Sequence, residues 1–226
     1  RRVGIVIPPP YSPGSPRHGD HRMNDTPLIQ ETHPGRPVVN RRLSQEAFRK
    51  LTAGQVINQT QYVNGQVEPN PLFGELFKER DRYYVEAYAN MGMELVQRPG
   101  FFYVRSLSEA QNDDDTRDHE STGAIRQVQG VLLVLGRGVL EKGFMFEALT
   151  LPDAGISREI LENIGNDPVF NQILKACKMD QPLPEAVKVA LVDRDIAYFN
   201  VKGNLVLAES GKAFFDDLFI EYQSGE

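Results

Sequence analysis

Large apolar side chains recur with a helical period from residue 73 to residue 91, which predicts one amphipathic helix. Asn70 and Pro71 precede this stripe as an N-cap residue and a proline at the first helical position, and Gly92 is expected to end the helix. The apolar residues that follow are interrupted by a turn signal. They predict a hairpin with strands at 94–97 and 101–106 around a turn at 98–100.

The same succession of helices and a hairpin recurs later in the chain. Ser157, Asp167 and Pro184 mark the expected starts of three short helices with apolar stripes. After them we expect strands at 196–201 and 205–209 around a turn at 202–204, and then an amphipathic helix capped by Ser210. Three short helices followed by a two-stranded ribbon is the plan of a winged-helix domain. The first unit, whose opening helix Ser44 is expected to cap, follows a similar plan with longer helices.

We therefore predict a mainly α fold with short β-hairpins, arranged as tandem winged-helix domains. Between the units, Ser121 or Thr122 is expected to cap a long apolar helix that ends at Gly136-Arg137-Gly138, and an apolar helical segment is expected at 144–151. The predicted organisation is a flexible proline-rich tail at 1–42, a first winged-helix domain at 43–107, an acidic loop at 108–120, connecting helices at 121–151 and a second winged-helix domain at 152–226. The tail has too few large apolar groups to form a core, and the sequence leaves open whether the native chain starts at Met23 or upstream of it.

Composition and charge restrict the classes of function. The 226 residues are 40% hydrophobic and 25% charged, and one cysteine excludes an internal disulfide, so we expect a cytoplasmic protein. The net charge of −6 is uneven. Residues 1–50 carry nine Lys/Arg and four Asp/Glu, a balance of +5, whereas the remainder carries sixteen and twenty-seven, a balance of −11. An acidic globular part argues against strong binding to nucleic acid without a partner.

Candidate chemistry is sparse. The acidic run Asp113–Asp115, with Asp118, His119 and Glu120, lacks the alternating ligands and central glycine of a calcium loop, and His119 has no zinc-ligand partner at a suitable spacing. Cys177 lies on an apolar helical stripe and is interpreted as a core residue. We therefore predict no enzyme, no catalytic residue, no cofactor and no metal, and rank a hydrolase that uses the acidic loop last among the hypotheses.

Basic and aromatic side chains remain as candidate binding residues. Basic residues on the helices and ribbon of the second unit are candidates for contact with a DNA backbone, although solvated lysines are an equally good interpretation: Lys175, Lys178, Lys188, Arg194 and Lys202. Since consecutive residues of a strand point to opposite faces, Phe102 must point away from Phe101 and Tyr103. Aromatic and basic residues of the first unit are therefore candidates for contact with a protein partner: Tyr83, Arg98, Phe102 and Arg105.

Two blocks of the sequence resemble a known family. The stretches NPLFGELF and RDRYYVEAYANMGMELVQRPGFFYVRS are similar to the N-terminal part of MukE, the non-ATPase subunit of the bacterial condensin MukBEF. The stretch LVDRDIAYFNVKGNLVLAESGKAFFDDL resembles the C-terminal winged helix of that family. The proline-rich start, shorter central region and lack of a long acidic tail are closer to divergent members, namely MksE of the Mks condensins or the related small subunit of Wadjet plasmid-defence complexes.

The resemblance implies a tandem winged-helix, kleisin-interacting subunit without catalytic activity. Such a protein would form a homodimer and bind a kleisin of the MukF/MksF type. It would lie over the ATPase heads of an SMC-like partner of the MukB/MksB type, where it would help to clamp DNA at the nucleoid. The role would be chromosome organisation or plasmid defence. The alternative is a stand-alone winged-helix transcription regulator, which would bind short DNA at physiological salt without help.

Overall fold

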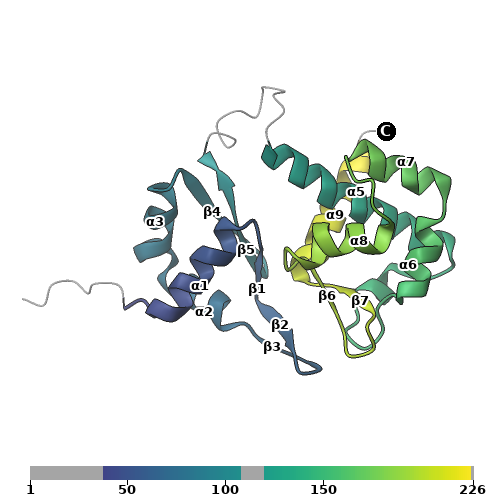
Figure 1. The fold of residues 1–226 in the computed structure, drawn as a ribbon. Coiled ribbons are helices and arrows are strands. Elements are labelled where there is room, and N and C mark those ends of the chain that lie inside the picture. The colour runs from purple at the N-terminus through teal and green to yellow at the C-terminus, as the bar shows by residue number, and fades with distance from the viewer. Residues whose placement is uncertain (1–37, 108–119, 225–226) are drawn as a thin grey trace, which may run out of the picture. The chain divides into compact units, whose positions relative to one another are not determined.

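The computed structural model describes residues 38–107 and 120–224, called the first and second halves below, and these are mainly helical with small antiparallel sheets (Figure 1). The first half contains α1 (Arg41–Thr52), β1 (Ile57–Asn58), β2 (Thr60–Val63), β3 (Gln66–Pro69), α2 (Pro71–Glu79), the π-helical turn η1 (Arg80–Tyr84), α3 (Val85–Ala89), β4 (Met93–Arg98) and β5 (Phe101–Ser106). The second half contains α5 (Glu120–Glu141), the 3₁₀ turn η2 (Phe146–Leu149), α6 (Arg158–Gly165), α7 (Pro168–Ala176), α8 (Leu183–Val187), the π-helical turn η3 (Lys188–Val192), β6 (Ala197–Phe199), β7 (Leu205–Leu207) and α9 (Glu209–Ser224). Most of the expected tail and acidic loop lies outside the described residues.

Three of the predicted helix starts are confirmed. Asn70, Ser157 and Asp167 cap α2, α6 and α7, and each side chain accepts a hydrogen bond from a backbone N–H of the first turn. The predicted cap of the first helix is wrong. Asn40 caps α1 by accepting from the N–H groups of residues 42 and 43, while Ser44 is buried one turn further along.

The long helix α5 does not end at the Gly136-Arg137-Gly138 sequence, contrary to the prediction, but continues to Glu141. The two glycines allow close packing. A β-carbon at position 136 would lie 2.2 Å from Cε2 of Phe215, and one at position 138 would lie 2.4 Å from Cγ2 of Ile164. Glycine is therefore needed at these positions because neighbouring side chains approach the helix axis closely.

Three other expectations about the second half were wrong in the length or the position of an element. The apolar segment 144–151 contains one turn of 3₁₀-helix, η2, in place of a longer helix. The strands β6 and β7 are three residues each, shorter than expected. The last helix begins at Glu209, so Ser210 does not precede it as a cap but lies buried inside it.

The sheet β1-β5-β4 has both of its faces covered. β5 pairs antiparallel with β4 and with β1, where Ile57 faces Phe102 across the strands. Phe102 belongs to a core with α1, α2 and α3, whereas its neighbour Phe101 belongs to the larger core of the second half. The prediction that Phe102 points away from Phe101 is thus confirmed, and one strand supplies side chains to two cores.

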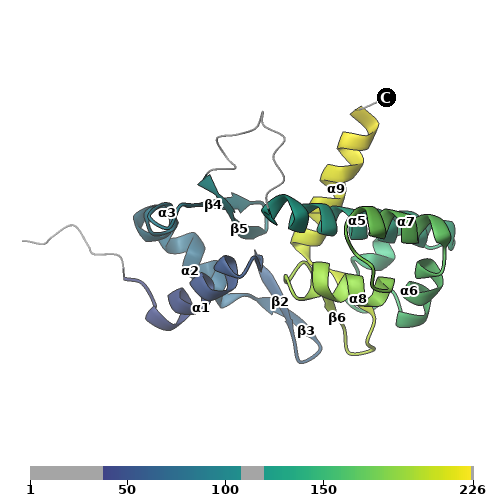
Figure 2. The ribbon, with the colours of Figure 1, turned by 45° about the horizontal axis from the view of Figure 1, so that its top comes forward.

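A second hairpin of the first half, β2–β3, was not expected from the sequence. Its turn is Asn64-Gly65, where both residues have positive φ angles of 52° and 86°. It lies beside the β6–β7 hairpin in both ribbon views (Figures 1 and 2). The rings of Tyr62 and Tyr198 stack there with centroids 4.7 Å apart, so the two halves are in direct contact.

Candidate functional site

The five predicted DNA contacts do not form one free basic surface. Lys188 pairs with Asp193 at 2.9 Å, and Nζ of Lys202 donates a hydrogen bond to a backbone carbonyl of the loop before α6 at 2.8 Å. Arg194 is half-buried and lines a groove that is described below. Lys175 and Lys178, at the end of α7, are exposed. Two of the five therefore lie on the surface without an ion pair to the described residues.

The four predicted partner contacts also lie in different settings. Phe102 is fully buried in the core of the first half, so its ring is not on the surface of this structure. Tyr83 is half-buried and packs edge-on against Phe48 with centroids 6.3 Å apart. Arg105 is exposed and pairs with Glu94 of the adjacent strand at 2.6 Å. The fourth, Arg98, lines the same groove as Arg194.

This groove, the apolar groove below, encloses about 450 Å³ between the β4–β5 hairpin, the start of α5, the residues after η3 and α9. Its apolar lining includes Tyr103, Ile125, Val128, Phe214 and Leu218. Its charged lining consists of Arg98, Arg105, Arg194 and Asp217. Two of the three guanidinium groups are already paired, Arg98 with Asp217 and Arg105 with Glu94, so the charge that remains at the rim is that of Arg194.

Arg98 and Asp217 connect the two halves across the apolar groove. The guanidinium group of Arg98 donates two hydrogen bonds to the carboxylate, one of them at 3.0 Å. These hydrogen bonds lower the pKa of Asp217 from its ordinary value, and Coulombic attraction to Arg98 acts in the same direction. The same hydrogen bonds raise the pKa of Arg98. Nε of Arg194, buried in the same groove, has no hydrogen-bond partner among the described residues.

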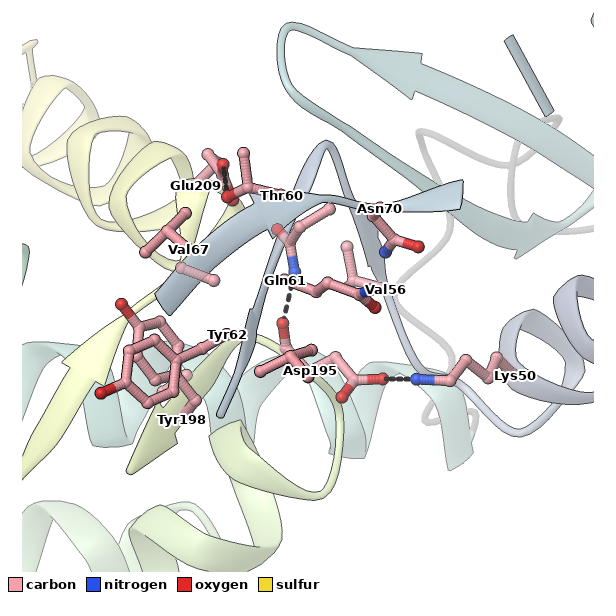
Figure 3. A pocket seen from close by; sticks show the side chains of 14 residues that line it. Lys50, Val56, Thr60, Gln61, Tyr62, Val67, Asn70, Asp195, Tyr198 and Glu209 are labelled. Carbon is pink, nitrogen blue, oxygen red and sulfur yellow. Dashed lines mark hydrogen bonds and ion pairs between the residues drawn. The ribbon is translucent and has the colours of Figure 1, made fainter. Parts of the chain in front are cut away.

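A smaller polar pocket of about 270 Å³ lies between the β2–β3 hairpin and the second half (Figure 3). Lys50 pairs with Asp195 across it at 2.8 Å, and Thr60 donates a hydrogen bond to Glu209. Nδ2 of the buried Asn58 donates to the backbone carbonyl of Asp195 at 2.6 Å, and its Oδ1 accepts from a backbone N–H of α9. Because these groups already pair with one another, the pocket joins the halves and offers few free donors or acceptors to a ligand.

Burial favours the neutral forms of two tyrosines and of the one cysteine. Desolvation raises the pKa of Tyr84 and of Tyr198 to about 12 each, and it raises the pKa of Cys177. The Cys177 thiol is therefore poorly suited to act as a nucleophile. Among the described residues there is no group of three or more His, Cys, Asp or Glu side chains placed to hold a metal ion, and the run Asp113–Asp115 lies outside them. None of the helices in the described ranges is long and apolar enough to cross a membrane.

Several residues of these two sites were not singled out from the sequence. Phe214, Asp217 and Leu218 lie on α9 and line the apolar groove, and their helical spacing was visible as part of an amphipathic helix. Asn58 could not have been found from any pattern, since its partners are more than a hundred residues away in the chain. The Asn64-Gly65 dipeptide is a typical hairpin signal, and the β2–β3 hairpin beside the polar pocket could have been predicted from it.

Comparison with known proteins gives one family. A family model described as condensin complex protein MksE matches residues 42–219, which is most of the chain and includes both halves. No curated protein sequence matches the chain.

Proposed function

Because the chain belongs to the MksE family of condensin complex proteins, we propose that it is a non-catalytic subunit that binds a kleisin and helps to hold DNA at SMC-type ATPase heads. Membership of the family makes it an accessory subunit of a multi-subunit condensin complex. The proposed partners are a kleisin of the MukF/MksF type, an ATPase of the MukB/MksB type, DNA and a second copy of this chain. The proposed location is the cytoplasm, at the nucleoid, in chromosome organisation or plasmid defence.

We further propose that each half is a winged-helix domain, and the strand pairing supports this. In the first half β1 precedes the paired helices and bonds to β5, the second strand of the following hairpin. In the second half Ile156 precedes α6 and forms an antiparallel bridge with Leu205, which is in β7, again the second strand of a hairpin. Both halves thus contain a helix, a short segment paired with the later hairpin, further helices and that hairpin in the same order, and the first half has the additional hairpin β2–β3 before its further helices.

The observation that carries the kleisin proposal is the apolar groove. Its lining is mainly apolar, so an occupant would remove hydrophobic surface from water. Arg194, whose Nε has no hydrogen-bond partner among the described residues, would favour a carboxylate on that occupant. A kleisin segment that combines apolar and acidic residues has this chemistry. The positive charge of Arg194 argues in the same way against a basic occupant.

Two matched substitutions on α5 test this proposal. Ile125 is 56% exposed and lines the groove, whereas Leu133 is 39% exposed on the same helix and does not line it. Glutamate at position 125 should repel an acidic segment and reduce the apolar surface of the groove, whereas glutamate at position 133 should do neither. We expect Ile125→Glu to weaken kleisin binding by at least about tenfold, which corresponds to about 1.4 kcal/mol of binding free energy, and Leu133→Glu to leave it unchanged.

The measurement is co-purification followed by titration of the full chain with a kleisin of the MukF/MksF type from the same genome. Equal binding by both variants would remove the apolar groove from the proposal. A wild-type chain that captures no kleisin but shifts a short DNA duplex at physiological salt would contradict the accessory role and favour a stand-alone regulator.

A further inference from the structure

Helix α1 carries three arginines on one exposed side, called the α1 basic face. Arg41, Arg42 and Arg49 are all exposed, and so are Gln45 and Thr52. At about 100° of rotation per residue, these five positions fall within one side of the helix. The opposite side, with Ala47 and Leu51, is buried in the core of the first half, so the helix is held in a fixed orientation.

The arginines of this face have no carboxylate partner among the described residues, although other cations of the chain do. Lys50 is on the same helix but turns toward the second half, where it pairs with Asp195. The nearest acid in the helix, Glu46, is half-buried and forms no ion pair with the described residues. Lys188 of the second half, one of the predicted DNA contacts, is by contrast ion-paired with Asp193.

The position of the arginines is unfavourable for the helix itself. Arg41 and Arg42 occupy the first turn of α1, which has no acidic residue, whereas acidic side chains stabilise a helix at that end. A carboxylate does lie at this end, since Glu75 of α2 accepts a hydrogen bond from the backbone N–H of Asn40 at 2.8 Å, but it forms no ion pair with Arg41 or Arg42 within the described residues. Side chains that oppose local stability are common where a protein binds a ligand.

We propose that the α1 basic face binds the phosphate backbone of duplex DNA, which locates the DNA contact of the proposed function in the first half. Arginine donates paired hydrogen bonds to phosphate, and three of them on one face can follow neighbouring phosphates. Contacts with phosphates alone do not distinguish one base sequence from another, so this binding is non-specific. It would be weak for a single chain and would add to contacts made by partners in the complex.

The chemistry of the face favours duplex DNA over other polyanions. Proteins that hold single strands stack bases on exposed aromatic rings, but Phe48 of α1 packs against Tyr83, Tyr84 and Tyr88. A helix that lies on an anionic bilayer needs an exposed apolar side, and the apolar side of α1 is buried. The face is thus suited to charge-based contact with a double helix.

The test is titration of a fluorescently labelled duplex of random sequence with the full chain, alone and bound to its kleisin, over a range of salt concentrations. In the variant Arg41→Gln/Arg42→Gln/Arg49→Gln, the salt slope should fall by about 0.9 for each arginine that neutralises a phosphate, or by about 2.7 if all three do so. We expect at least a tenfold decrease in affinity at about 50 mM salt. A matched control, Arg137→Gln/Lys142→Gln/Lys212→Gln, removes three exposed charges from the second half that are not candidate DNA contacts and should change the affinity less than threefold.

Kleisin binding by the α1 variant should remain at the wild-type level, which separates this inference from the apolar-groove proposal. Equal decreases in affinity for the two triple variants would show a general charge effect and overturn the inference. Undetectable duplex binding by the wild type in both forms would overturn it as well. So would a variant that no longer binds vesicles of anionic phospholipid while retaining its affinity for the duplex.

Discussion

The two halves of the chain repeat an order of elements but carry different surfaces and cores. The described first half has nine Lys/Arg and seven Asp/Glu, a balance of +2, and the described second half has ten and fifteen, a balance of −5. The first half has a core rich in aromatic rings, such as Tyr84, Tyr88 and Phe102, whereas the second has a larger and mostly aliphatic core. Two segments that both contain helices followed by a hairpin can therefore differ in net charge and in the composition of their cores.

The halves are nevertheless not independent in their packing. Val56 and Phe101 of the first half are buried in the core of the second half. Asn58, Lys50 and Thr60 add polar contacts between the halves around the polar pocket. The two halves thus form one connected unit although their surfaces differ. A destabilising substitution in one half should therefore also lower the stability of the other.

The largest expected effect tests that connection through two adjacent rings. Phe101 and Phe102 are fully buried on opposite faces of β5, each in a different core. Substitution of either by alanine should lower the free energy of unfolding by about 3–5 kcal/mol, because removal of a buried phenyl ring leaves a cavity. If the halves unfold together, both variants should show a single urea transition at which circular dichroism and tyrosine fluorescence coincide.

If Phe102→Ala unfolded in two separate urea transitions, the second at the wild-type midpoint, the prediction that the two halves unfold together would be wrong. The halves would then be independent folding units that only touch. The pair of variants is informative because the same chemical change is made at neighbouring positions of one strand.

A smaller effect is expected from two helical glycines, one in each half. Gly136 of α5 lies against Phe215, whereas a β-carbon at Gly74 of α2 would have no neighbour within 4 Å. Gly136→Ala should therefore destabilise the chain by about 1–3 kcal/mol through overpacking. Gly74→Ala should stabilise it by about 0.5–1 kcal/mol, because alanine favours the helix. Thermal unfolding of both variants measures the difference, and a gain in stability for Gly136→Ala would show that the glycine serves no packing role.

These glycines also show where prediction from the sequence reached its limit. Local signals such as Asn70-Pro71, Ser157 and Asp167 predicted helix starts well, because a cap is formed by residues adjacent in the chain. Gly136 was interpreted as a helix end because its reason for being glycine, the ring of Phe215, is distant in sequence. Local patterns identify local interactions and cannot identify close approach between elements.

The candidate sites show the same difference between interactions that are local in the sequence and those that join distant elements. The basic residues of the second half could be picked out from the sequence, but the pairing of Lys188 with Asp193 is seen only in the folded chain. The apolar groove combines β4, β5, α5 and α9, so its position could not be read from any one segment. The α1 basic face was present in the sequence as part of the positive balance of residues 1–50, but helical phase and burial were needed to show that its arginines share a side.

The smallest expected effect concerns the ion pair between the halves, Arg98–Asp217. The side chains are 34% and 42% exposed, so solvent screening limits the contribution to less than about 1 kcal/mol. Arg98 lowers the pKa of Asp217 in the folded chain, so the stabilisation is present above the unfolded aspartate pKa of about 3.9 and disappears as the pH falls through the lower folded value. Asp217→Asn should therefore be slightly less stable than the wild type at pH 7 and equally stable at the acid end of the profile.

Urea unfolding of the wild type and of Asp217→Asn from neutral pH down to about pH 3 measures whether their free energies of unfolding become equal. This pH range includes the ordinary pKa of aspartate. Asp216→Asn is the matched control, because Asp216 is the adjacent exposed carboxylate on α9 and forms no ion pair with the described residues. It should lack the decrease in stability at neutral pH that Asp217→Asn shows. If the difference in free energy of unfolding between wild type and Asp217→Asn were the same at the lowest pH, the substitution would act through the packing of α9. The ion pair would then make no measurable contribution, and apolar contacts would join the two halves.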